Sequence, residues 1–562
     1  MDKFGFHTEG ASNEPLGVEF GDASPGISEK VEQNDATCAK SDLPTDTGFF
    51  STMSALRRDY GLQLLIMISL SSHWCKGFCR SQYMQSIRYL LQAWNVSGPR
   101  IDSLTAIIEV PWSLKPMLAL CSDLFPLFGY SKNPYIFLTT VLGIAGLCVA
   151  CFISPESSVP AELPAGGLFL ATFAWMTCDI LVEGVYSRRM GEHVESGPSL
   201  VVFINVGQQI AVLISSLLSG FVLEHLDGFQ GLSGAQWNLA FCIVPTSLVL
   251  LPVCFNYLGE SKTSPARSIL RTQKEVVALS FITCIGSLIF VTVGIVSVDS
   301  TQPFFITALV VLLLVNFSSW FFLRPIIGRL VLFLAIASAS NLSLGGAAHY
   351  FYTDPPSAYP EGPHFEPWFF VTVCGLAGAV ASIAASLVFV FFKSVSFRKI
   401  YTVFILLNAA LSLPNCLLFA RVNLTWGISD YWFVASDTVV QSAMNVLYFI
   451  PGFLLLSRVC PNKIESTMFA ILASNTNLAQ TITYPISGYI CEGFGIVPTG
   501  ADNESSVFDN LWIANIVMAG IKLAPLACIS LLPACRMTDA VVHSDDPVNT
   551  NSPLSRFIKW IY

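Results

Sequence analysis

The sequence predicts an all-α polytopic membrane protein. Of its 562 residues, 53% are hydrophobic and only 12% are charged, and the mean hydropathy is +0.61. A soluble domain carries roughly 25% charged residues, so much of this protein's surface must face lipid. Apolar segments of about 20 residues recur along the chain, and each is long enough to cross a hydrocarbon core about 30 Å thick.

The apolar segments follow a polar N-terminal region. Residues 1–58 are acidic, rich in Ser, Thr, Gly and Pro, and show no periodicity, so we expect a disordered tail. The first span is the weakest, because His73, Lys76 and Arg80 interrupt it. The fourteen predicted spans are 61–84, 99–124, 134–154, 165–189, 199–224, 235–258, 275–297, 303–323, 326–352, 366–392, 398–420, 427–456, 465–496 and 508–534.

Loop charges predict the orientation of these spans. If the N-terminus is cytoplasmic, the inward connections hold the basic residues, including Lys132 and Arg188. The opposite loops contain no Lys or Arg, namely 155–164, 225–234, 298–302, 353–365 and 497–507. Arg80, Arg88 and Arg421 are outward exceptions. This positive-inside pattern predicts that both termini are cytoplasmic.

The spans divide as six, two and six. The longest basic inward loop, 259–274, follows the sixth span, and weak internal similarity relates the two sets of six. We therefore expect a six-helix bundle at 59–258, a loop and extra helix pair at 259–325, a second six-helix bundle at 326–535, and a cytoplasmic tail at 536–562. Two six-helix halves with a substrate site between them at the midplane are typical of the major facilitator superfamily.

Asp179 and Glu183 are the most notable charges at membrane depth, where charges are expensive and face a cavity or each other. Their i, i+4 spacing places two carboxylates on one helical face. Such a pair suits a proton relay, because like charges in a low dielectric raise at least one pKa. Alternatively, the two carboxylates form structural ion pairs with Lys115 or Lys76. Both interpretations stay open.

Other polar and aromatic residues within the spans are candidates for substrate contact. Lys522 lies near the middle of the last span, where it requires a buried partner or an anionic substrate. Glu109 and Lys115 flank a proline break, and such breaks are tolerated where they line a cavity. Trp112 and Trp175 could stack against a flat ring, although core packing is the more frequent role of such residues.

Several classes of protein are excluded. The chain has no metalloprotease, serine-hydrolase or phosphate-loop motif, so an enzyme or an ATP-driven pump is not expected. Most of the sixteen cysteines lie in apolar runs, where Cys behaves as a small hydrophobe, and none has metal-site spacing. We expect no cofactor, no metal and no nucleic-acid partner.

One stretch resembles a known family. Residues 111–130 read PWSLKPMLALCSDLFPLFGY, which is similar to the signature of the folate–biopterin transporter family, a branch of the major facilitator superfamily. Further similarity includes Lys76-Gly77, the Asp179/Glu183 pair and a second signature at 461–472. The resemblance covers roughly residues 60–535 and is closest to protozoan members with fourteen spans.

The resemblance implies a plasma-membrane carrier that imports folates or pteridines together with protons. Asp123 is expected to gate the cytoplasmic side by capping a neighbouring helix N-terminus. Many members of the family have two adjacent basic residues after the Gly-Tyr pair, whereas here Lys132 is the only basic residue just after Gly129-Tyr130. We assign substrate contact to Lys76, Glu109, Trp112, Lys115, Trp175, Asp179, Arg421 and Lys522; proton coupling to Asp179, Glu183 and Glu109; and gating to Asp123, Gly129, Tyr130, Arg188 and Glu465.

Our hypothesis is alternating-access uptake of folate or biopterin by a monomer. One alternative is a carrier of the same family for another metabolite such as S-adenosylmethionine, which is cationic and would favour a carboxylate-dominated site. Another is a receptor or scaffold that keeps the fold without transporting. A membrane-embedded enzyme is the least favoured alternative.

Overall fold

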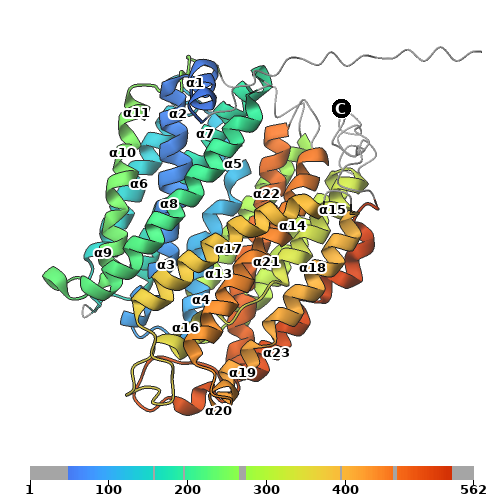
Figure 1. Ribbon diagram of the computed structural model, residues 1–562. Helices are drawn as coiled ribbons and strands as arrows, with labels where there is room; N and C mark the ends of the chain where they lie inside the picture. The colour runs from blue at the N-terminus through green and yellow to red at the C-terminus, as the bar shows by residue number, and fades with distance from the viewer. Residues whose placement is uncertain are drawn as a thin grey trace, which may run out of the picture. The chain divides into compact units, whose positions relative to one another are not determined.

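The computed structural model describes residues 49–155, 158–193, 196–264, 274–392, 395–459 and 465–534. Throughout these ranges the chain consists of helices and their connections (Figure 1). Residues 1–48, the predicted C-terminal tail, most of the connection before residue 274 and the start of the second signature lie outside the described residues. So does the side chain of Glu465. The predicted disorder is wrong for residues 49–58, because they belong to a helix, α1 (Phe49–Tyr60).

The first set of helices, Leu62–Cys254, is called the N half here, and α1 (Phe49–Tyr60) precedes it. Its elements are α2 (Leu62–Ile68), η1 (Ser69–Cys79), α3 (Arg80–Ala93), α4 (Gly98–Glu109), η2 (Val110–Ser113), α5 (Lys115–Leu124), α6 (Asn133–Phe152), α7 (Glu162–Glu192), α8 (Gly197–His225), η3 (Phe229–Gly231), α9 (Gly234–Phe241), α10 (Ile243–Leu248) and α11 (Leu250–Cys254).

A central pair, α13 (Lys274–Val296) and α14 (Gln302–Phe322), leads to the C half, Pro325–Leu531. The elements of the C half are α15 (Pro325–Ala339), α16 (Gly345–Thr353), η4 (Trp368–Val373), α17 (Cys374–Val388), η5 (Phe389–Phe392), α18 (Phe397–Ser412), α19 (Asn415–Phe419), α20 (Val422–Thr425), α21 (Asp430–Val459), α22 (Glu465–Gly493), η6 (Ser505–Phe508), α23 (Leu511–Ile521) and η7 (Ala524–Leu531).

Helices occupy all fourteen predicted span ranges. Within the described residues, eleven helical segments are long and apolar enough to cross a membrane, and α15 is apolar but shorter. The first predicted span, with its three basic side chains, is not among the eleven. The count of fourteen therefore stays a prediction, whereas the polytopic helical architecture is observed.

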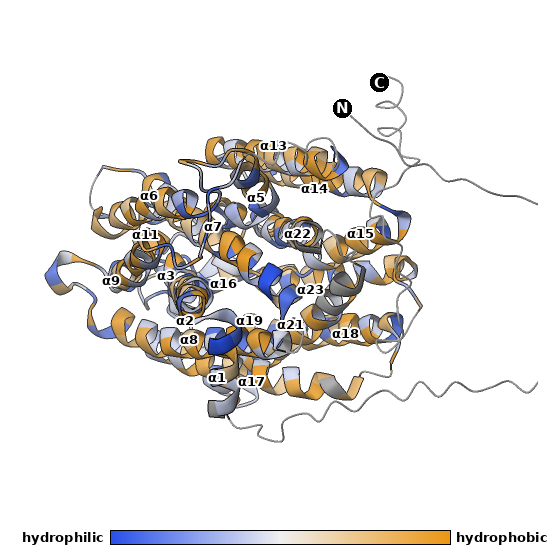
Figure 2. Ribbon diagram, turned by 90° about the horizontal axis from the view of Figure 1, so that it is seen from above, coloured by the Kyte–Doolittle hydropathy of each residue, from blue (hydrophilic) through white to orange (hydrophobic). Residues whose placement is uncertain are grey.

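Apolar side chains cover the rim of the structure. Figure 2 shows α13, α14, α17 and α18 coloured mainly as hydrophobic. Leu313 and Phe317 on α14 and Leu387 on α17 are each more than 60% exposed. A soluble monomer rarely exposes a contiguous apolar surface of this kind, so these faces are suited to lipid.

Glycines allow some helices to pack with their backbones in contact. Gly146 on α6 faces Gly167 on α7, and a Cβ at either position would clash with the carbonyl oxygen of the other. Small residues at such contacts are typical of helix pairs in membranes, where association depends on close packing and not on the hydrophobic effect.

The two halves also meet closely at the end of the bundle opposite α1, at the bottom of Figure 1. We call this the distal end. There the Gly98 backbone nitrogen donates to the Pro498 oxygen at 2.9 Å, and the Tyr350 hydroxyl donates to the Val96 oxygen at 2.7 Å. A Cβ at position 346 would clash with the carbonyl oxygen of Gly98, so only glycine fits there. The distal end is thus sealed by direct backbone contact.

Candidate functional site

The first spanning unit changes its winding where its charged residues begin. The segment η1 is a π-helix, and such wide turns are frequently found at functional sites. It carries Lys76, whose Nζ lies 3.2 Å from Asp179 Oδ2 on α7. Arg80 begins the α-helix that follows, and its Nη2 lies 2.6 Å from Glu109 Oε2 on α4.

Lys115 completes this set of charges. Its Nζ lies 2.6 Å from Asp179 Oδ2 and 3.9 Å from Glu183 Oε2. Three cations therefore meet three carboxylates inside the N half. We call the set the N-half charge network, and it consists of Lys76, Arg80, Glu109, Lys115, Asp179 and Glu183.

The proline break after α4 places Trp112 between the two parts of this network. Arg80 Cζ and Lys115 Nζ each lie 5.2 Å from the centre of the Trp112 ring, within the range of a cation–π contact. The break also frees backbone carbonyls. Asn477 on α22 donates to the Trp112 oxygen at 3.1 Å, and the Ser474 hydroxyl donates to the Ser113 oxygen. These two hydrogen bonds connect the N half to the C half at the proline break.

Burial differs within the network. The side chains of Asp179 and Lys115 are 4% and 8% exposed, whereas those of Lys76 and Arg80 are 33% and 39% exposed. The central ion pair is therefore enclosed, and removing one partner would leave an uncompensated buried charge. Lys76 and Arg80 in turn extend the network to accessible space.

A cavity of about 320 Å³ lies between α3 and the C half. Its polar wall contains Arg88, Asn341, Ser343, His349, Ser412, Asn415, Asp437, Gln441, Asn445, Asn515 and Lys522, and its apolar wall includes Tyr352, Phe370 and Phe419. A neighbouring cavity of about 230 Å³ shares Arg88, His349 and Phe370 with it. We call the larger one the central cavity. Its volume is at the lower end of the range for small-molecule sites.

A break in a spanning unit forms part of this wall. Residues 340–344 separate α15 from α16 and are not helical, and four of them line the central cavity. Irregular backbone at membrane depth is tolerated where it lines a cavity or is buried in protein. Broken helices of this kind commonly form transporter binding sites.

Hydrogen bonds orient the cavity side chains of the C half. Lys522 Nζ donates to Ser412 Oγ at 2.7 Å, and Asn515 Nδ2 donates to the Ser412 oxygen at 2.9 Å. Asn341 Nδ2 donates to Asn445 Oδ1 at 3.3 Å. The wall therefore presents several amides, each able to donate and accept hydrogen bonds.

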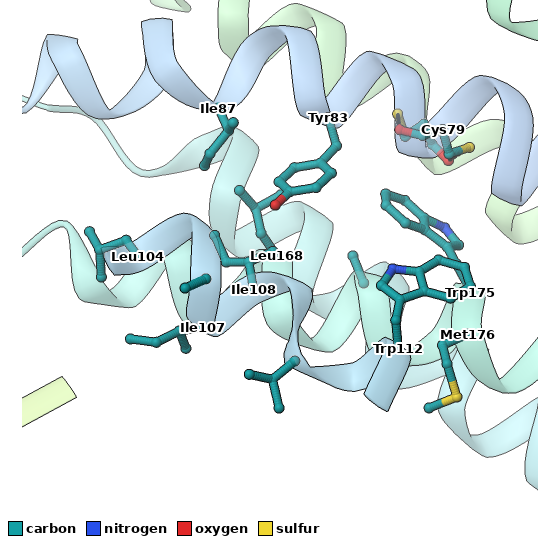
Figure 3. Packing of buried hydrophobic residues seen from close by; sticks show 14 of the residues in the cluster. Cys79, Tyr83, Ile87, Leu104, Ile107, Ile108, Trp112, Leu168, Trp175 and Met176 are labelled. Atoms are coloured by element: carbon teal, nitrogen blue, oxygen red, sulfur yellow. Dashed lines mark hydrogen bonds between the residues drawn. The ribbon is translucent and has the colours of Figure 1, made fainter. Parts of the chain in front are cut away.

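The structure distributes the predicted substrate residues over four places. Five belong to or contact the N-half charge network, namely Lys76, Glu109, Trp112, Lys115 and Asp179. Lys522 lies in the central cavity. Trp175 is 1% exposed, and its indole nitrogen donates to Thr246 Oγ1 at 3.0 Å. Figure 3 shows Trp175 in a buried cluster together with Trp112 and Tyr83. Arg421 pairs with Asp430 at 3.0 Å near the distal end.

The residues predicted to gate lie near the α1 end. Asp123 faces Lys132 at 3.6 Å, and among the described residues it caps no helix N-terminus, contrary to the expectation. The N-terminus of α6 is instead capped by Glu260, which accepts from the backbone nitrogens of Lys132 and Asn133 at 2.9 and 3.1 Å. Glu260 reaches this position from the loop after α11, a placement that the sequence does not reveal.

The other predicted gating residues have varied surroundings. Gly129 adopts a φ of +84°, which favours glycine. Tyr130 follows it in the same turn, where its backbone nitrogen donates to the Leu127 oxygen at 2.9 Å. Arg188 is exposed near the end of α7.

The sequence interpretation missed most of the central cavity, although a signal was present. Asp437, Gln441 and Asn445 follow one another at i, i+4 and i+8, which places a polar stripe on one face of α21. The sequence marks Arg88 only as an outward exception to the positive-inside pattern. Among the described residues no group of His, Cys, Asp or Glu is arranged to hold a metal ion.

Solved structures match the fold. The fold matches an auto-inhibited POT family peptide transporter with a TM-score of 0.58 and 11% identity, over 85% of this chain and 99% of that one. It matches a POT family transporter in complex with 5-aminolevulinic acid with a TM-score of 0.57 and 14% identity, over 84% and 96%. The all-α fold of the major facilitator type is thereby confirmed.

Sequence comparison then gives the family. The profile of the BT1 family matches residues 76–551, and the chain belongs to that family. It is therefore a multi-pass membrane transporter and not an enzyme. The predicted family resemblance is confirmed.

Curated relatives extend over most of this chain. "Probable folate-biopterin transporter 2" of Arabidopsis thaliana is 24% identical over 79% of this chain and 77% of its own length. "Folate-biopterin transporter" of Synechocystis is 24% identical over 86% and 85%. "Folate transporter 1" of Plasmodium falciparum is 22% identical over 82% and 78%.

Proposed function

We propose that this chain is a secondary carrier that imports folate or biopterin across the plasma membrane by alternating access, as a monomer. The central cavity is the observation that carries this proposal. It lies between the two halves of a BT1-family chain, which is where a major facilitator fold binds its substrate.

The chemistry of the cavity suits a flat heteroaromatic cargo. Phe370 and Tyr352 offer ring faces for stacking. Asn415, Gln441 and Asn515 offer amides to a ring edge that both donates and accepts hydrogen bonds. A pteridine ring has both properties.

We call the closed contact between the halves at the distal end the distal seal, and it corresponds to one state of the transport cycle. We propose that the distal end faces outward, because the loops 353–365 and 497–507 there lack Lys and Arg. The structure would then be closed to the outside. Opening requires the contact between Gly98 and Gly346 to separate, together with the hydrogen bond at 2.9 Å from the Gly346 backbone nitrogen to Asp102 Oδ1.

The N-half charge network is our candidate for proton coupling. Asp179 contacts both Lys76 and Lys115, whereas Glu183 is 25% exposed and lies 3.9 Å from Lys115. We therefore propose that Glu183 exchanges the proton, with Glu109 as a second acceptor through its pair with Arg80. If uptake at a fixed substrate gradient ignores external pH between about 5 and 8, no carboxylate of this network is coupled to transport.

A competition panel tests the cargo. Cells expressing the chain should accumulate labelled folate or biopterin, and unlabelled folate, biopterin or methotrexate should compete, while S-adenosylmethionine should not. Uptake of S-adenosylmethionine without uptake of either pteridine would instead support the cationic-cargo alternative. Binding of a pteridine without counterflow in vesicles would indicate a receptor.

A further inference from the structure

The wall of the central cavity carries more positive than negative charge. Its ionisable side chains are Arg88, Lys522, Asp437 and His349. Whether or not the imidazole is protonated, the cations outnumber the single carboxylate. A charge at membrane depth is expensive unless it is paired or meets a ligand, so the excess indicates an anionic ligand.

Arg88 is the clearer of the two cations. It is half-buried on α3 and lines both cavities. Among the described residues no carboxylate lies within 4.0 Å of its guanidinium, and no hydrogen bond from it is observed. Asp102 on the neighbouring α4 accepts a hydrogen bond from the Gly346 backbone nitrogen, and it interacts with Arg88 electrostatically from beyond ion-pair distance. A planar guanidinium without an ion-pair partner is suited to bidentate binding of a carboxylate.

Lys522 approaches the same cavity from the other half. It follows α23, is 7% exposed, and donates to the neutral hydroxyl of Ser412. No described carboxylate forms an ion pair with it. An anionic ligand that meets both cations would therefore connect α3 of the N half to the C half. Such a contact forms only when the two halves are arranged around the cavity as they are here. A cargo that binds one arrangement of the halves more tightly than another shifts the equilibrium between them.

The remaining charge, Asp437, can accept hydrogen bonds from the cargo. It lies on the polar stripe of α21, and Gln441 Nε2 donates to its Oδ1 at 3.4 Å. A carboxylate is an acceptor only, and the amino and ring N–H groups of a pterin form a double donor edge that matches it. The aromatic side chains of Tyr352 and Phe370 line the same cavity.

We propose that Arg88 and Lys522 bind the carboxylates of the cargo while Asp437 accepts hydrogen bonds from its pterin edge, so that this chain selects folate-type pteridines over uncharged ones such as biopterin. This proposal rests on the proposed function and specifies its substrate. It makes Arg88 the main specificity-determining residue, because Arg88 lines both cavities and forms no ion pair within 4.0 Å among the described residues.

Paired transport measurements test the selectivity. In vesicles containing purified protein, Arg88→Gln should raise the folate concentration for half-maximal uptake by at least about tenfold, since it removes a charge-assisted contact. Biopterin uptake should change less than about twofold. Arg88→Lys should recover part of the folate uptake. Arg329→Gln is the matched control, because Arg329 is exposed on α15 and lines neither cavity.

The other outcomes also decide the question. Equal losses of folate and biopterin uptake in Arg88→Gln would show a conformational role and overturn the proposal, as would unchanged folate uptake. If the wild type carries neither pteridine, the proposed function fails, and the anion site is tested alone with 4-aminobenzoyl-glutamate, the tail fragment of folate. Thermal stabilisation of the wild type and Arg329→Gln but not Arg88→Gln would support the site, and any other pattern would overturn it.

Discussion

In the N-half charge network every cation has a carboxylate partner, whereas in the central cavity Arg88 and Lys522 have none within ion-pair distance among the described residues. The two regions lie in the same membrane-spanning body, where an unpaired charge is expensive. Charges that are already paired hold helices together and can be re-paired during a cycle. Cations without a carboxylate partner remain available to an anionic ligand. Substitutions in the two regions should therefore fail in different ways.

The largest effect is expected from Lys115→Met in the network. It leaves Asp179 buried with only the 3.2 Å contact to Lys76, and loss of one partner from a buried pair costs about 3–5 kcal/mol. Uptake should fall to less than about a tenth of the wild-type level, and the melting temperature should fall with it. The double variant Lys115→Met/Asp179→Asn should regain stability but not transport.

Lys262→Met is the control for that change, because Lys262 is exposed outside the network. It should leave uptake and melting temperature as they are in the wild type. If Lys115→Met itself transports normally, Lys115 has no part in the mechanism.

The distal seal should respond to Gly346→Ala with the next largest effect. The new methyl group would clash with the carbonyl of Gly98 and force α16 away from α4. Hydrogen exchange of the loop 353–365 should become faster, and uptake should fall several-fold, because the halves no longer close. Gly520→Ala is the matched control, since a Cβ there has no neighbour within 4 Å. Equal exchange in the two variants would contradict the seal.

A smaller effect should follow from pH at the same seal. Burial, together with the nearby Glu504, raises the pKa of Asp354 from its ordinary 3.8 to about 7, and Gln92 Nε2 on α3 donates to its Oδ1 at 3.1 Å. Because the closed state binds the proton more tightly, Asp354 favours closure most below its ordinary pKa, and that contribution is lost as pH rises through about 7. Opening should increase roughly tenfold from about pH 6 to about pH 8.

Asp354→Asn isolates this contribution. After correction for the intrinsic rate, hydrogen exchange of the loop 353–365 should depend on pH in the wild type but be nearly flat in the variant. The same pH dependence in both proteins would assign it to another group.

The smallest effect is expected from Trp175→Phe in the core. It removes the bond to Thr246 at 3.0 Å and should lower stability by roughly 1 kcal/mol. Uptake per folded molecule should stay within about twofold of the wild type. A selective loss of pteridine affinity would instead indicate that Trp175 contacts the substrate.

The sequence predicted what depends on local pattern. Apolar length gave the helical ranges, and the spacing of Asp179 and Glu183 gave one shared face, with Lys115 or Lys76 as possible partners. The structure brings both lysines to Asp179. The central cavity depends instead on how the two halves pack. Arg88, which lies just beyond the predicted first span, does not reveal which side chains lie opposite it.

Entrance counterflow in vesicles is the most direct test of the central claim, that the cavity between the halves carries a carboxylated pteridine. Wild-type vesicles loaded with unlabelled folate should transiently accumulate labelled folate from outside, and Arg88→Gln vesicles at the same low folate concentration should not. Accumulation to the same level in both, or in neither, would contradict the account.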